Sequence, residues 1–153
     1  MRSIQGQKAE IKRARDALAL LCRLVYEKFG KDALPLIEEA CYKLGVADGE
    51  KDRRDSGSVS FKEFQEVLLG YMTKEGIPFE LIELSDTKTH RKSYIHMRCP
   101  LGLTNTSHEL CESMMALDKG RIEAAIEKKV KLDILKTVAS GDPYCETIWT
   151  VIE

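Results

Sequence analysis

Apolar residues recur every three or four positions through the first half of the chain, a spacing that predicts amphipathic helices. The first predicted helix covers residues 9–29, and Gly30 ends it. The second begins at Asp32, tolerates Pro35 in its first turn and runs toward Gly49. The apolar stripes of these two helices consist of Ile11, Ala14, Leu18, Leu21, Val25 and Phe29, then Leu34, Ile37, Cys41, Leu44 and Val46.

A third helix is expected over residues 60–74, after a charged stretch. Residues 50–58 are charged or small, which favours a solvated helix end followed by a loop. Ser60 and Glu63 then stand three apart, as in a capping box, and Val59 and Phe64 are placed to form a hydrophobic staple. The first half of the chain is therefore predicted to supply three helices.

After Gly76 the period of the apolar pattern shortens to two residues, which predicts strands. Residues 77–84 and 89–99 are expected to pair across a polar turn at 85–88, and residues 131–139 and 144–152 across a second turn. A fourth helix over 106–128 separates the hairpins, and Thr106 and Glu109 have capping-box spacing at its start. This order predicts an α+β domain with three N-terminal helices, then a β-hairpin, a helix and a β-hairpin, in which helices cover an antiparallel four-stranded sheet.

Size and charge limit the classes of function. The 153 residues are expected to form a single domain, 1–153, since a chain of this length buries enough surface for one core. Its 24 basic and 25 acidic side chains give a formal net charge of −1, which offers no attraction for nucleic acid or an anionic membrane. The longest apolar stretch, residues 17–22, is far too short for a membrane span, so a cytoplasmic protein is expected. Five cysteines are an odd number, and reduced thiols are expected.

Three of the cysteines and one histidine stand at the ends of predicted elements in the second half of the chain. Cys99 ends a predicted strand, and Cys145 begins the last one. His108 and Cys111 share one face of a helix start because they are three residues apart. If the strand ends meet under this helix, the thiols of Cys99, Cys111 and Cys145 converge, with the His108 imidazole as a fourth ligand. Such a set of ligands matches zinc.

Two other interpretations of these residues stay open. Cys111 with His108 supplies the side chains of a nucleophile and its base, although the sequence fixes no third group to orient them. Alternatively, the three cysteines pack as small apolar side chains and His108 lies on the surface. Cys22 and Cys41 stand within apolar helical stripes, where packing alone is expected.

Methionines and a tryptophan are candidates for the lining of a ligand pocket. Met97, Met114, Met115 and Trp149 would form an adaptable apolar surface for a hydrophobic small molecule. Methionines at helical spacing also pack in ordinary cores, so core packing is the competing interpretation of this set.

Four segments of the second half, 99–100, 107–111, 116–120 and 136–146, carry the most specific motifs, above all Gly-Asp-Pro-Tyr-Cys at 141–145. Together with the helical segments 26–30 and 44–50, they resemble the 4-vinyl reductase domain superfamily and, within it, the aminothiazoline carboxylate hydrolase-like branch. The resemblance covers most of the chain. It implies an α+β ligand-binding fold that is shared with subunits of a vesicle-tethering complex.

The resemblance implies more than one activity. Members bind hydrophobic small molecules or tetrapyrroles, act as sensory input domains or, in the named hydrolase, open a thiazoline ring. We therefore expect a small-molecule-binding or sensing domain, and the alternative is a hydrolase that opens a cyclic amide or thioimidate through Cys111 and His108. A structural subunit that forms a homodimer is a third hypothesis, which rests on the relationship to tethering-complex subunits.

Overall fold

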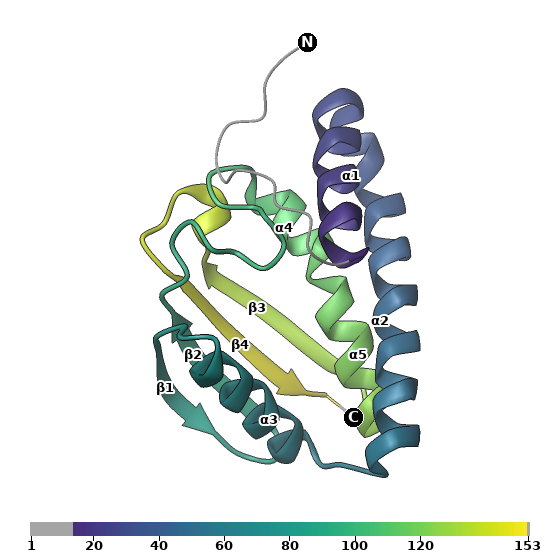
Figure 1. Ribbon diagram of the computed structural model, residues 1–153, viewed down its shortest axis with the longest axis vertical. Helices are drawn as coiled ribbons and strands as arrows, with labels where there is room; N and C mark the ends of the chain where they lie inside the picture. Colours follow the sequence, from purple (N-terminus) through teal and green to yellow (C-terminus); the bar gives the residue numbers. More distant parts are fainter. Residues whose placement is uncertain (1–13, 153) are drawn as a thin grey trace.

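The computed structural model describes residues 14–152, and its order of helices and strands is the one expected (Figure 1). Residues 9–13 of the first predicted helix lie outside the described residues. The elements are α1 (Ala14–Phe29), the 3-10 helix η1 (Gly30–Ala33), α2 (Leu34–Ser56), α3 (Phe61–Lys74), β1 (Phe79–Leu84), β2 (Lys88–Ser93), α4 (His108–Met114), α5 (Ala116–Ile126), β3 (Val130–Lys136), the 3-10 helix η2 (Val138–Ser140) and β4 (Cys145–Val151).

The four strands form one antiparallel sheet in the order β1-β2-β4-β3, which confirms the predicted α+β class. The central strand pair places Thr89 opposite Trp149, and Leu132 lies on the other side of Trp149. Side chains on one face of this sheet pack against α3 and α5, and Figure 1 shows α1 and α2 outside α5. The helices therefore cover one face, as the sequence predicted.

Two buried clusters hold the layers together. The first lies among α1, α2, α4 and the segment 99–106, and it contains Cys22 and Cys41, which are 5% and 0% exposed. This burial confirms the packing expected for both cysteines. The second joins Phe61 of α3, Ile122 of α5 and Trp149 of β4. Met115, between α4 and α5, packs against both clusters.

Glycines bring α2 and α5 unusually close together. A Cβ atom on Gly45 would lie 2.0 Å from the Leu117 carbonyl oxygen, and one on Gly49 would lie 2.3 Å from the Arg121 carbonyl oxygen. From the other side, a Cβ atom on Gly120 would lie 2.5 Å from the Tyr42 carbonyl oxygen. Each glycine weakens its helix by roughly 1 kcal/mol relative to alanine. The close backbone contact is what these glycines make possible.

The second helix is longer than predicted, because the charged stretch after Gly49 continues it to Ser56. Two charged side chains in this stretch form ion pairs with residues at α5, although solvent exposure was expected for the stretch. Asp52 accepts two hydrogen bonds from Arg121, at 2.6 and 3.1 Å, and Arg53 lies 2.8 Å from the Glu127 carboxylate. Gly57, with a φ of 78°, then ends the helix.

The prediction of a strand from 89 to 99 was wrong beyond Ser93, where β2 ends. Successive turns replace the extended backbone: the Arg98 amide donates to the Ile95 carbonyl, and the Gly102 amide donates to the Cys99 carbonyl. His96, at φ 47°, has the left-handed conformation that interrupts a strand. Residues 95–99 therefore do not alternate between the two faces of the sheet as strand residues would.

The predicted helix 106–128 is divided, and its start was misplaced by one residue. Ser107, not Thr106, is the N-cap, because its side chain accepts a hydrogen bond from the Leu110 amide. Thr106 instead donates its hydroxyl proton to the Leu103 carbonyl. Glu109, the expected capping-box partner, accepts a hydrogen bond from the Tyr26 hydroxyl at 3.0 Å. The helix breaks at Met115, which caps α4 and precedes α5.

The predicted strand 131–139 also ends early, at Lys136. The hydroxyl of Thr137 caps η2 by accepting a hydrogen bond from the Ala139 amide, so the chain turns before Gly141. Among the residues that the model describes, no helix combines the length and the apolar character that a membrane span requires.

A pair of glycine substitutions tests the contact between α2 and α5. Gly45→Ala should lower the free energy of unfolding by about 2 kcal/mol, because an overpacking cost of about 3 kcal/mol exceeds about 1 kcal/mol gained in helix propensity. Gly70→Ala, on the open surface of α3, has nothing within 4 Å of the new Cβ and should instead stabilise by up to about 1 kcal/mol. Urea unfolding of both variants measures the difference. Equal stabilisation by the two substitutions would contradict the close contact.

Candidate functional site

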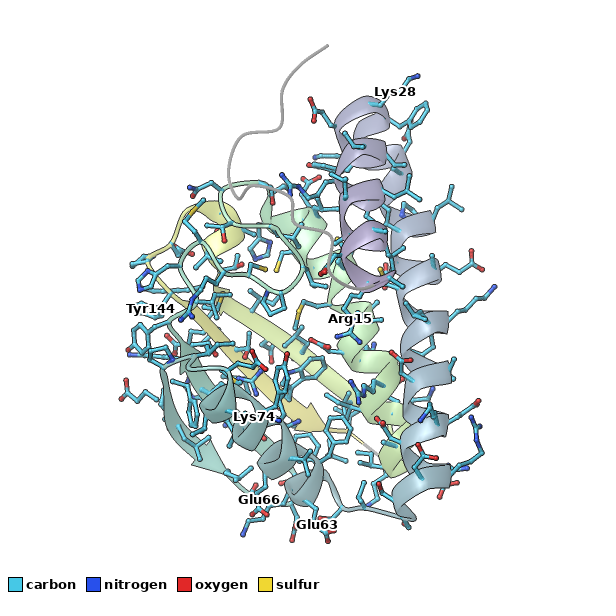
Figure 2. The ribbon with its side chains drawn as sticks, in the orientation of Figure 1. Arg15, Lys28, Glu63, Glu66, Lys74 and Tyr144 are labelled. Carbon is cyan, nitrogen blue, oxygen red and sulfur yellow. The ribbon has the colours of Figure 1, made fainter. Side chains whose placement is uncertain are left out.

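The three cysteines singled out from the sequence lie around one end of the sheet. The Cys111 sulfur accepts a hydrogen bond from the Thr137 hydroxyl at 3.4 Å, and the Cys145 sulfur accepts one from the Val138 amide at 3.4 Å. Cys99 and Cys111 both pack against the first buried cluster. Figure 2 shows several sulfur atoms in this part of the molecule, between α4 and the end of β3.

Burial dominates the chemistry of these thiols. Burial is the main reason that the pKa of Cys111 is raised to about 12, and electrostatic interactions with Cys99, Cys145 and Asp118 contribute to this rise, which indicates that the three thiols are near one another. Burial also raises the pKa of Cys99 and of Cys145. Hydrogen bonds from Thr137 act in the opposite direction on Cys111 and Cys145. The thiols are therefore protonated near neutral pH, in the form that is a poor nucleophile.

His108 does not join the cysteines in this structure. It begins α4 with a side chain that is 48% exposed, and its Nδ1 lies 3.8 Å from the Glu112 carboxylate. Within residues 14–152, no three His, Cys, Asp or Glu side chains are grouped so that they could hold a metal ion. Zinc bound by Cys99, Cys111, Cys145 and His108 stays a prediction, and so does catalysis by Cys111 with His108.

The four residues predicted to line a pocket lie in different environments. Trp149 belongs to the second buried cluster and Met114 to the first, while Met115 contacts both. Met97 is 48% exposed, in the turns that follow β2. Three of these side chains are therefore part of the core, and a single pocket lined by all four stays a prediction.

A set of polar side chains on α3 and β2, not identified from the sequence, carries polar atoms that are shielded from solvent. We call these side chains the polar interior cluster: Gln65 and Thr89, which are fully buried, and Arg91, which is partly buried. Gln65 and Thr89 are both 0% exposed. Neither amide atom of Gln65, nor the Thr89 hydroxyl, nor Nε and Nη1 of Arg91 has a hydrogen-bond partner among the described residues. Most buried polar atoms in proteins do have partners. This set is therefore unusual.

The three side chains of the polar interior cluster face the same layer. Thr89 and Arg91 are two residues apart in β2, so they point to the same face of the sheet. Gln65 belongs to the buried stripe of α3, one turn after Phe61, and α3 packs against β2. Trp149 lies opposite Thr89 on the neighbouring strand. The unpaired polar atoms are therefore bordered by aromatic side chains.

Charged residues of three helices lie around this layer. Burial raises the pKa of the Asp118 carboxyl, while Arg15, Arg91 and Arg121 counteract that shift. Arg15 also lies 3.3 Å from Asp48, and Figure 2 shows it in the first turn of α1, beside α5. One feature of the sequence could have indicated this charged layer. Arg91 lies between Thr89 and Ser93 on the face of β2 that is turned to the core, where apolar residues are usual.

Comparison with known proteins supports the fold. No family model matches the chain, and no curated protein matches it. Among solved structures, the phenol-responsive sensory domain of the transcription activator PoxR, in a structure with phenol, is similar with a TM-score of 0.58 and 18% identity. The match covers 93% of this chain and 76% of that domain.

A second similar structure is a trafficking protein particle complex subunit 3 from Naegleria fowleri, covalently bound to palmitic acid. Its TM-score is 0.62 at 16% identity, over 91% of this chain and 95% of the subunit. At such identities the likeness shows a shared fold only. The observed α+β fold agrees with the fold that the resemblance implied, and membership of the 4-vinyl reductase superfamily and of its narrower branch both stay predictions.

The raised pKa of Cys111 predicts slow chemical modification of its thiol. At pH 8 its thiolate fraction should be about a thousandfold below that of an unperturbed cysteine, because the pKa is raised from 9.0 to about 12. Peptide mapping by mass spectrometry after timed alkylation measures the rate, which should increase tenfold per pH unit. Rapid labelling of Cys111 at pH 8 would contradict the protonated thiol. Acceleration by a chelator would instead reveal a bound metal ion.

Proposed function

We propose that this chain is a small-molecule-binding domain and that its ligand lies between α3, β2 and α5, at the polar interior cluster. The observation that carries the proposal is the set of buried polar atoms on Gln65, Thr89 and Arg91 for which the described part of the chain supplies no hydrogen-bond partner. A ligand with hydrogen-bonding atoms would satisfy them. The surrounding Phe61 and Trp149 side chains would bury its apolar part.

A purely structural role accounts poorly for these side chains. Leaving a buried donor or acceptor unsatisfied costs about 1–3 kcal/mol, and the cluster contains several such atoms. An apolar residue of similar size at Gln65 would remove that cost without loss of packing. Residues that reduce stability in a core are often retained for function. Binding is therefore the explanation that we favour.

The structural neighbours agree with this proposal without establishing it. The PoxR domain was solved with phenol, a small aromatic molecule, and it has the same fold as this chain. Sensing, in which ligand binding alters a partner or a second copy of the chain, is the role that we propose for this binding. The homodimer and the cytoplasmic location stay expectations from the sequence.

Removal of the unsatisfied amide should stabilise the protein and abolish binding. In the ligand-free protein, Gln65→Leu is expected to raise the free energy of unfolding by about 1–3 kcal/mol, since the variant no longer buries an amide without a partner among the described residues. Native mass spectrometry should show a small molecule retained by the wild-type protein and absent from the variant. A destabilised variant that still retains the molecule would contradict the proposal.

A threonine pair gives a matched control for this experiment. Thr89→Val should stabilise by about 1 kcal/mol and weaken ligand retention, because the buried Thr89 hydroxyl has no partner among the described residues. Thr150→Val makes the same change on the opposite face of the sheet, in β4, and should alter neither property by a measurable amount. Thermal denaturation with and without the retained molecule compares the two. Equal effects of both substitutions would indicate a general effect of valine in strands.

A further inference from the structure

We infer that the ligand carries an anionic oxygen group, of the kind found in a small organic acid, and that Arg91 binds this group inside the domain. This inference rests on the proposed function and adds to it the chemical class of the ligand. The geometry that supports it is the position of Arg91 in β2, two residues from Thr89 on the face of the sheet that α3 covers. Its Nε and Nη1 atoms are shielded from solvent and, like the polar side-chain atoms of Gln65 and Thr89, have no hydrogen-bond partner among the described residues.

Arg91 differs from the two other arginines near α5. Arg15 and Arg121 each have a carboxylate partner, Asp48 at 3.3 Å and Asp52 at 2.6 Å. No carboxylate of the described residues lies within 4.0 Å of the Arg91 guanidinium, whose Nε and Nη1 are shielded from solvent. Nε and Nη1 carry three of the five N–H donors of an arginine. These donors remain available to a ligand.

The charge of Arg91 is balanced at longer range. Asp118 interacts electrostatically with Arg91 but makes no direct ion pair with it among the described residues. Arg15 and Arg121 share the same carboxyl group. This arrangement stabilises the partly buried Arg91 cation, while the N–H donors of its Nε and Nη1 have no partner among the described residues. A carboxylate is the ligand group that accepts several such donors at once.

The neighbouring side chains supply further hydrogen-bond donors and an apolar surface. The Gln65 amide nitrogen and the Thr89 hydroxyl add two donor groups to those of Arg91. Trp149, opposite Thr89, and Phe61, one turn before Gln65, supply aromatic surface. A planar acid with an aromatic or heterocyclic body matches this combination. A neutral molecule would leave the Arg91 charge uncompensated at short range.

Two probes of equal size and different charge test the inference. Benzoate and benzyl alcohol should be titrated calorimetrically into the full chain at matched ionic strength. Benzoate should bind at least about tenfold more tightly, because hydrogen bonds between charged groups are the stronger class. In Arg91→Met this preference should disappear. Arg54→Met, on the exposed surface of α2, should keep it.

The other outcomes separate the anionic ligand from the proposed small-molecule binding. Equal or tighter binding of benzyl alcohol by the wild-type protein would overturn the anionic ligand and leave small-molecule binding standing. Tighter binding of inorganic phosphate than of benzoate would overturn the organic acid. If no probe binds, the inference is overturned, and native mass spectrometry of the purified protein then decides whether the proposed function stands. Should Arg91→Met fail to fold, Arg91→Lys keeps a charge and should retain a reduced preference for benzoate.

Discussion

The close contact between α2 and α5 is the constraint on which the rest of this molecule depends. Gly45, Gly49 and Gly120 allow the two backbones to approach so closely that Cβ atoms at these positions would overlap the opposite carbonyl groups. The contact fixes α5 in position, and α5 in turn carries Ile122 of the sheet core and Asp118 of the charged layer. The glycines lower the helix propensity of α2 and α5, and the free energy of packing between the two helices compensates for this loss.

The interior combines two kinds of packing with different consequences. Near α1 and α4 the core is apolar and includes buried thiols, whose protonated form is favoured by their surroundings. Between α3 and β2 the interior contains polar side-chain atoms that have no hydrogen-bond partner within residues 14–152, a costly arrangement in the free protein. The two regions therefore contribute unequally to stability. The less stabilising one, between α3 and β2, is the region in which we place the ligand. The two similar solved structures show that this fold has been found with a small aromatic molecule and with a fatty acid.

The cysteines illustrate how position changes chemistry. From the sequence, Cys111 beside His108 resembles a nucleophile with its base. In the structure the thiol points toward Thr137 in the interior, whereas the imidazole points outward to Glu112. Residues three apart on a helix lie on the same broad face. Here one edge of that face, with Cys111, is turned to the core, and the other edge, with His108, is turned to solvent. Burial then raises the pKa of one group and leaves the other at the surface.

The sequence by itself determined the order and type of the helices and strands, because the 3.6-residue and two-residue periods of apolar positions reflect which side of each element is buried. It also identified the caps at Ser60 and the burial of Cys41. It could not determine the end of β2, where turns around His96 replace the strand, since a short alternating segment is compatible with both. Only the tertiary structure placed Gln65 and Arg91, 26 positions apart in the chain, in the same layer, because α3 packs against the strand that carries Arg91. Whether a polar side chain has partners is a property of its neighbours in space, and the chain order does not contain that information.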